Sequence, residues 1–300
     1  MLALLLAWPV GLYLWANSMV QRTPALSAAS GTPGTTYLLA GTDARDGVLA
    51  TDATEGSRTD TIMLLHVPTS GPTALISLPR DTYTAIPGYD DNKLNTSYAR
   101  GGPALLVEAV EGLTGLDVDH YVEVGFGGVA GVVDAVGGVE LCLDMDVDDE
   151  KSHLVWESGC HMADGPTALA FARMRYSDPE GDIGRTARQQ QLLQALTRTV
   201  ADPGLLARPG DQVELLRTGT SALTVSEGSS LLDLGRLALA VRAATGPAGI
   251  TGTPPIVSMD HRPGGVGSTV LLDPDRTPQF FADIRDGALP PGDVGGVPDL

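Results

Sequence analysis

Arginine and aspartate residues recur in this chain at the ends of segments that are expected to be strands or helices. They lie in five short segments, Gly41-Thr-Asp43, Arg58-Thr-Asp60-Thr61, Leu78-Pro-Arg80-Asp81, Arg173-Met-Arg175 and Gly184-Arg185 through Gln189. Guanidinium groups bind phosphate oxygens in pairs, and carboxylates bind the divalent cation that accompanies a pyrophosphate. If these segments meet in the fold, the sequence predicts a pyrophosphate site.

Three strands are expected to bring the first of these residues together. They are predicted at residues 36–40, 61–67 and 74–78. The turn residues between the second and third strands predict a hairpin. The entry and exit of a hairpin lie at one end of a sheet, so Arg58 and Asp60 should lie near Arg80. Asp43 follows the first strand, and ligand sites occur at such strand ends.

The clearest helix is predicted over residues 184–200, where one stripe contains Arg185, Gln189, Leu192 and Leu196. Its polar members lie in the first turns, where the helix dipole favours an anion. Arg188 lies one turn from Arg185 and either joins it or faces solvent. Arg173 and Arg175 are two positions apart and would share a face in an extended segment.

Ordinary ion pairs are the competing explanation, and they account for any single arginine as well as a bound anion does. The candidate pairs are Arg58–Asp60, Arg80–Asp81 and Arg185–Asp182. They account poorly for the whole set, because few folds bury so much positive charge without an anion.

The net charge of the chain is −18 and its pI is near 4.4, which excludes a typical nucleic-acid binder. At 300 residues and 43% hydrophobic composition, the chain can bury a sizeable core. Residues 1–20 carry no charge and are long enough for a transmembrane anchor. We expect a linker over 21–34, one catalytic domain over 35–290 and a flexible tail over 291–300.

Further elements are expected along the domain. Helices are predicted at 103–111, 127–136, 166–171 and 231–243, and strands at 120–124, 139–143, 256–259 and 270–272, with an acidic loop over 144–150. This alternation predicts a layered domain of the α/β or α+β class. Cys142 and Cys160, the only cysteines, are expected to form a disulfide if the chain is exported; two free thiols are the alternative.

Several motifs together resemble the LytR-CpsA-Psr (LCP) family. They are Gly41-Thr-Asp-Ala-Arg, Arg58-Thr-Asp-Thr, Ser77-Leu-Pro-Arg-Asp, Asn92-Lys-Leu-Asn-Thr-Ser-Tyr98, His120-Tyr-Val-Glu-Val, Val136-Gly-Gly-Val-Glu140, Ala170-Phe-Ala-Arg-Met-Arg-Tyr176 and Gly181-Asp-Ile-Gly-Arg with Arg188-Gln-Gln-Gln. They occur in family order over residues 36–200. The resemblance implies the α/β/α LCP domain, with a mixed central sheet.

The resemblance also implies an activity. Members of the family are membrane-anchored, outward-facing enzymes that move a glycopolymer, as a sugar-1-phosphate, from a polyprenyl-pyrophosphate carrier to a muramyl 6-hydroxyl of peptidoglycan. Carried over by motif, the pyrophosphate ligands would be Arg58, Arg80, Arg173, Arg175, Arg185 and Gln189. Asp43 and Asp60 would hold Mg²⁺ or Mn²⁺.

Some assignments stay open at this point. Asp60 or Asp43 is the candidate for taking the acceptor proton, and Asp182 is a candidate for orienting Arg185. Lys93, Asn95 and Tyr98 would either touch the donor head group or anchor a loop. Six apolar residues could line a prenyl tunnel, but packing in the core explains them better, namely Leu105, Leu106, Val110, Phe126, Val129 and Val132. A pyrophosphatase and a non-catalytic wall-binding or regulatory protein are the alternative functions.

Overall fold

The computed structural model describes residues 2–29, 31–42, 59–175, 177–178, 182–200, 204 and 209–296. The chain divides into two compact units, each made of two segments. The sheet unit comprises Arg22–Gly125 and Thr224–Leu300, and the helical unit comprises Met1–Gln21 and Phe126–Leu223. The catalytic domain expected over residues 35–290 therefore contains parts of both units.

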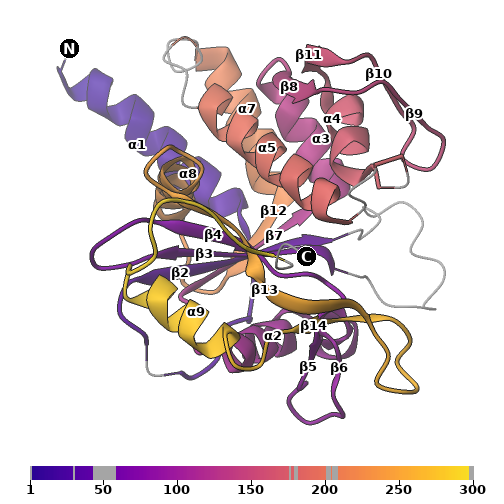
Figure 1. Cartoon of the computed structure of the whole chain (residues 1–300). Coiled ribbons are helices and arrows are strands. Elements are labelled where there is room, and N and C mark those ends of the chain that lie inside the picture. The colour runs from indigo at the N-terminus through magenta and orange to yellow at the C-terminus, as the bar shows by residue number, and fades with distance from the viewer. Residues whose placement is uncertain are drawn as a thin grey trace. The chain divides into compact units, whose positions relative to one another are not determined.

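The sheet unit is built on one mixed β-sheet (Figure 1). Its strands are β1 (Gln21–Thr23), β2 (Thr35–Thr42), β3 (Thr59–Val67), β4 (Ala74–Ser77), β7 (His120–Gly125), β12 (Leu223–Ser226), β13 (Ile250–His261), β14 (Thr269–Leu272) and β15 (Gly292–Gly296). The order is β1-β12-β7-β2-β3-β4-β13-β14, with β15 paired to β13. The β2–β3 and β3–β4 pairs are antiparallel, whereas β7 is parallel to β2 and β13 is parallel to β4. The predicted hairpin of β3 and β4 is confirmed.

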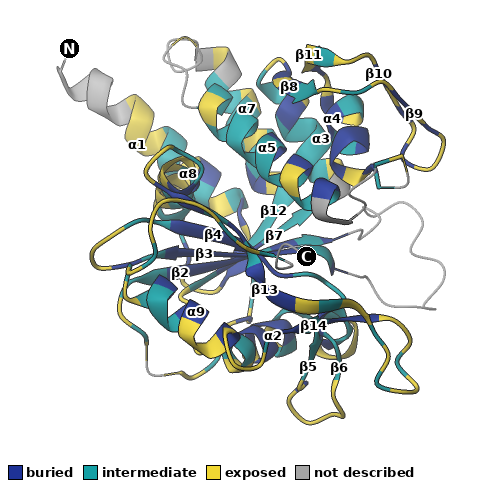
Figure 2. Ribbon diagram, in the orientation of Figure 1, coloured by how far each residue is buried: buried dark blue, intermediate teal, exposed yellow. Residues whose placement is uncertain are grey.

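Helices cover both faces of this sheet, which confirms the predicted α/β/α layering with a mixed central sheet (Figure 1). They are α2 (Leu94–Thr114), α8 (Leu231–Ala244) and α9 (Thr277–Arg285). Helices α2 and α9 share one core with the strands, in which Ile62 and Leu64 of β3 are buried with Leu106 and Phe281 (Figure 2). Because side chains alternate along a strand, the even-numbered residues of β3 face α2.

Helix α2 begins nine residues before the predicted helix, and its two parts meet at Gly102 and Pro103. Gly102 has φ 64° and ψ −154°, which is not helical. A positive φ suits glycine, and proline is favoured at the first position of the helical stretch that follows. Leu106 and Val110, considered for a prenyl tunnel, are fully buried in the core of the sheet unit.

The helical unit contains five described helices and two antiparallel strand pairs. The helices are α1 (Leu2–Met19), α3 (Phe126–Ala135), α4 (Gly165–Arg173), α5 (Asp182–Val200) and α7 (Pro209–Ala222). The antiparallel pairs are β8 (Val139–Leu143) with β11 (Gly159–Ala163), and, between them in the chain, the hairpin of β9 (Val147–Asp149) and β10 (Leu154–Trp156). Phe171 of α4 packs against Trp156 with ring centroids 5.3 Å apart. Cys142 and Cys160 face each other across β8 and β11 and are joined in a disulfide.

Some segments differ from the expectation. The stretch 144–150, predicted to be a solvated acidic loop, contains β9, in which Val147 and Asp149 are buried while Asp148 is exposed. The predicted linker contains β1, and the predicted flexible tail contains β15, whose Gly292 N–H donates to Gly249 O at 2.9 Å. Backbone pairing with an existing strand overrides the weak strand preference of Gly and Pro. In the part of the chain that the structure describes, no helix has both the length and the apolar character needed to cross a bilayer.

Candidate functional site

Asp60 and Arg80 lie at the same end of two neighbouring strands, because β3 begins there and β4 ends there. Antiparallel pairing aligns Met63 of β3 with Ser77 of β4, so the residues before Met63 and after Ser77 extend to the same edge. The Arg80 guanidinium forms an ion pair with the Asp60 carboxylate. The predicted proximity of these two residues is confirmed.

The loop that carries Arg80 is held by backbone hydrogen bonds from α2. The first N–H groups of a helix have no partner within it. Here the N–H groups of Leu94 and Asn95 donate to the carbonyls of Thr82 and Arg80, at 2.8 and 2.9 Å. The N–H of Val270 donates to Asp81 O at 2.9 Å. The position of Arg80 is therefore fixed through its own backbone.

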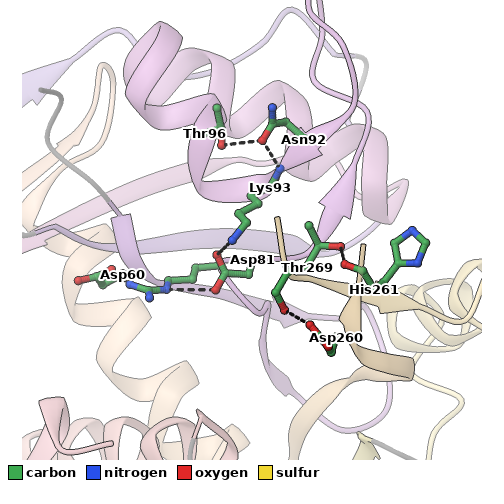
Figure 3. A network of polar contacts seen from close by, with 10 residues as sticks. Asp60, Asp81, Asn92, Lys93, Thr96, Asp260, His261 and Thr269 are labelled. Carbon is green, nitrogen blue, oxygen red and sulfur yellow. Dashed lines mark hydrogen bonds and ion pairs between the residues drawn. The ribbon is translucent and has the colours of Figure 1, made fainter. Parts of the chain in front are cut away.

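Charged groups continue from this ion pair along the loop. Arg80 Nε lies 3.6 Å from Asp81 Oδ2, and Lys93 Nζ lies 3.2 Å from Asp81 Oδ1 (Figure 3). Arg80 thus contacts Asp81, as the ion-pair interpretation expected, and Asp60 as well. Lys93 and Asn95 anchor this loop through the contacts described, which is one of the two roles that the sequence left open.

A second polar cluster surrounds Glu123 near the end of β7. Its carboxylate accepts hydrogen bonds from three hydroxyls, those of Thr42 at 3.2 Å, Tyr98 at 2.9 Å and Tyr121 at 2.7 Å. Burial, together with the charge of Glu123, raises the pKa of the Tyr121 hydroxyl. Sequence reasoning did not select Glu123, although its place near the end of a strand parallel to β2 was a usable signal.

The carboxylate pair predicted to bind a metal is only partly described. Asp43 and Arg58 lie outside the described residues. Their neighbours Thr42 and Thr59 are paired across β2 and β3 at the same edge as Asp60. Among the described residues, no group of three or more His, Cys, Asp or Glu side chains could hold a metal ion.

In the helical unit, Arg173 and Arg175 occupy different kinds of backbone. Arg173 is the last residue of α4, so the condition under which the pair would share a face, an extended segment, is not met at that residue. The chain becomes extended at Met174, with φ −57° and ψ 131°. Arg173 is exposed and, with His153 and Leu169, lines a hollow of about 390 Å³ between α4 and β10. Arg175 is half-buried.

Helix α5 carries Arg185 and Gln189 in its first turns, as predicted, with Leu192 buried in the core of the helical unit. Arg185 is half-buried, and Gln189 Nε2 lies 3.5 Å from Ala172 O. The side chain of Asp182 lies outside the described residues, so its pairing with Arg185 stays a prediction.

Arg188 takes neither of the two roles expected for it. Its side chain is buried and donates to the carbonyls of Phe171 and Met174, and it forms an ion pair with Asp178. The spacing of residues along one face of α5 could not predict this arrangement, because the partners of Arg188 lie outside that helix.

The predicted pyrophosphate ligands belong to both units. Arg80 lies in the sheet unit, where it contacts the predicted metal ligand Asp60, and the other described pyrophosphate ligands are in the helical unit, namely Arg173, Arg175, Arg185 and Gln189. The gathering of all six ligands at one site stays a prediction.

Comparisons with known proteins agree on the family. The LytR_cpsA_psr family model matches residues 16–240. The chain is 39% identical over 283 residues to the probable cell wall biosynthesis protein LcpB of Corynebacterium glutamicum, covering 91% of this chain and 66% of LcpB. It is 38% identical over 159 residues to the polyisoprenyl-teichoic acid–peptidoglycan teichoic acid transferase TagU of Bacillus cereus, covering 52% of each. The chain thus spans between about half and two thirds of these relatives.

A solved structure supports the fold. The LytR-Csp2A-Psr enzyme from Actinomyces oris superposes with a TM-score of 0.70 at 24% identity, covering 88% of this chain and 95% of that one. At this identity the likeness establishes the fold alone.

Proposed function

The chain belongs to the LytR-CpsA-Psr family, and we propose that it is an extracytoplasmic phosphotransferase of cell-wall assembly. Its donor is a glycopolymer linked through pyrophosphate to a polyprenyl carrier, and its acceptor is peptidoglycan. The printed name of TagU describes a transfer of this class, between a polyisoprenyl-linked polymer and peptidoglycan.

The Arg80–Asp60 ion pair is the observation that carries the proposal. A fixed guanidinium beside a carboxylate, at a sheet edge where strands end, suits a phosphate group and its cation. Phosphoryl transfer depends on positioning and on neutralising charge, more than on covalent chemistry by the protein. Arg80 meets the first requirement because backbone hydrogen bonds hold its loop.

The predicted arginines bind the donor in this proposal, and Asp43 and Asp60 hold Mg²⁺ or Mn²⁺. The residues present fit such an ion, because Mg²⁺ takes one or two carboxylates and completes its shell with water and substrate phosphates. Thr42 and Thr59 are cross-strand partners. Asp43 directly follows Thr42 and Asp60 directly follows Thr59 in the sequence. A bound divalent ion supplies neutralisation of charge on the phosphate oxygens.

The acceptor hydroxyl attacks the phosphorus attached to the sugar, the bond to the bridging oxygen breaks, and polyprenyl phosphate leaves. The acceptor proton passes to a carboxylate, for which Asp60 and Asp43 are the candidates. In the described structure the Asp60 carboxylate forms an ion pair with Arg80, which holds it at the end of the hairpin.

Attachment to the membrane through residues 1–20 is part of the proposal. Helix α1 exposes large apolar side chains that suit a lipid environment, namely Trp8, Val10, Leu14 and Trp15. The catalytic residues would then face the cell wall.

Incubating the full chain with lipid-linked glycan and peptidoglycan, with and without Mg²⁺, tests the function. We expect glycan covalently joined to the wall only when the metal ion is present. Free phosphorylated glycan would identify a pyrophosphatase instead, and binding without either product would identify a wall-binding protein. Asp43→Ala should abolish the response to Mg²⁺, and an unchanged response would overturn the metal assignment.

A further inference from the structure

We propose that Arg188 and Asp149 are positioning residues, which hold the Arg173–Arg175 segment in the conformation that binds the donor pyrophosphate. The inference rests on the proposed function for what the segment binds. The contacts that carry it lie within the helical unit, and neither residue was selected as a ligand.

Arg188 joins α5 to the end of α4. Its Nε donates to Phe171 O at 3.1 Å, a terminal nitrogen donates to Met174 O, and the other forms an ion pair with Asp178. The side chain is only 5% exposed. A guanidinium directed at these buried groups is not placed to bind a ligand from solvent.

The end of α4 requires such a donor. The last carbonyls of a helix have no N–H partner within it, and a positive charge there is favourable. Helix α5 supplies the hydrogen-bond donors and the positive charge. Arg188 donates to two carbonyls, and Gln189 Nε2 lies beside Ala172 O. Arg188 therefore binds carbonyls on both sides of Arg173 and fixes the direction in which the chain leaves α4.

Asp149, at the end of β9, holds the same segment through Arg175. Its buried carboxylate accepts the N–H of Lys151 at 3.0 Å. Burial would raise the pKa of this carboxyl, but the neighbouring backbone N–H groups of Lys151, Ser152 and Arg175 hold its pKa below the ordinary value. The backbone N–H of Arg175 therefore lies beside a buried carboxylate.

Two buried charges from separate elements therefore fix the backbone on which two predicted ligands are carried. A displacement of about 1 Å at such a segment can lower the rate by roughly 100-fold, because phosphoryl transfer depends on alignment. The role of Arg188 and Asp149 is to prevent that displacement.

The test uses Arg188→Lys, which keeps the charge but loses the planar fork, and Asp149→Asn, which keeps the shape but loses the charge. Matched controls are Arg198→Lys and Asp148→Asn, because both residues are exposed and lie on the same two elements. Hydrogen exchange at the Arg175 amide is measured first, in the full chain. Inorganic pyrophosphate binding is then measured by calorimetry.

We expect faster exchange at the Arg175 amide and about 10-fold weaker pyrophosphate binding in both test variants, with neither control changed. In an Arg173→Ala/Arg175→Ala background, either test substitution should weaken binding by less than about two-fold, because it acts through those arginines. Unchanged exchange, or the same 10-fold loss in that background, would overturn the inference. Failure of the wild-type chain to bind pyrophosphate would count against the proposed function, while exchange at Arg175 still decides whether the segment is held as inferred.

Discussion

The Asp60 carboxylate, at the start of the β3–β4 hairpin, and the Arg80 guanidinium, in the loop just after it, form an ion pair although they are 20 residues apart in sequence. Both side chains remain partly accessible, with 28% and 23% of their surface exposed. The pair is therefore open to a ligand as well as held by the fold.

Arg80→Ala should lower kcat/KM for glycopolymer transfer by about 100-fold or more, because a preorganised group that stabilises phosphate charge has an effect of that size. Its effect on the free energy of unfolding should stay within about 1 kcal/mol, since the ion pair is partly exposed. Transfer assays and urea unfolding measure the two quantities. Arg242→Ala, on the exposed side of α8, is the control. Unfolding of Arg80→Ala would instead make this arginine a structural residue.

Gly184→Ala should destabilise the helical unit, although alanine is normally the better helix former. A Cβ at Gly184 would lie 1.8 Å from Asp178 Oδ2, and that carboxylate is held by buried Arg188. Breaking a buried ion pair costs about 3–5 kcal/mol, which outweighs the helix gain of about 1 kcal/mol.

The matched control is Gly235→Ala in α8, where no atom lies within 4 Å of the new Cβ. It should be neutral or stabilising by up to about 1 kcal/mol. All three tryptophans, Trp8, Trp15 and Trp156, belong to the helical unit, so fluorescence during urea unfolding reports on that unit. Equal stability of Gly184→Ala and the wild-type chain would contradict the contact.

Removing the disulfide should also weaken the helical unit. The bond between Cys142 and Cys160 joins residues 18 apart, and closing a loop of that length stabilises by about 3 kcal/mol in the chain-entropy account. Cys142→Ser/Cys160→Ser should lose about that much, measured by tryptophan fluorescence. Reductant should lower the stability of the wild-type chain to the same level and leave the double variant unchanged. A response of the double variant to reductant would show that the loss has another cause.

The elements around Asp60 and Arg80 were predictable because their cause is local. Turn residues over 68–72 set the hairpin, and a hairpin brings its two ends together whatever else the chain does. The layering of strands and helices followed from their alternation along the chain, whereas the mixed sheet was implied by the family resemblance. The same local signals predicted α5 and the buried position of Leu192.

The role of Arg188 was not predictable because its partners lie on another element. Its spacing from Arg185 is a property of one helix, whereas its burial depends on the carbonyls at the end of α4. Asp149 was assigned to a solvated loop for the same reason, since an acidic run does not reveal which of its carboxylates is buried in the fold. Long-range satisfaction of backbone polar groups decides such positions.

Stability of the sheet unit should fall as the pH drops below about 6.5, the ordinary pKa of histidine. Burial lowers the pKa of His66, whose ring nitrogens lie 3.0 Å from Thr36 Oγ1 and 3.4 Å from Arg285 O. Below pH 6.5 the unfolded chain binds a proton at this histidine that the folded chain does not. The free energy of unfolding should therefore decrease with falling pH, by at most about 1.4 kcal/mol per pH unit for one proton.

Urea unfolding followed by circular dichroism between pH 7.5 and about 5.5 measures this slope, in a range above the titration of most carboxyls. His66→Gln removes the titrating group and should flatten the slope, whatever its effect on absolute stability. The comparison of slopes separates proton uptake from the loss of hydrogen bonds to Thr36 and Arg285, which is independent of pH in this range. Identical slopes in the two proteins would assign the proton uptake to another group.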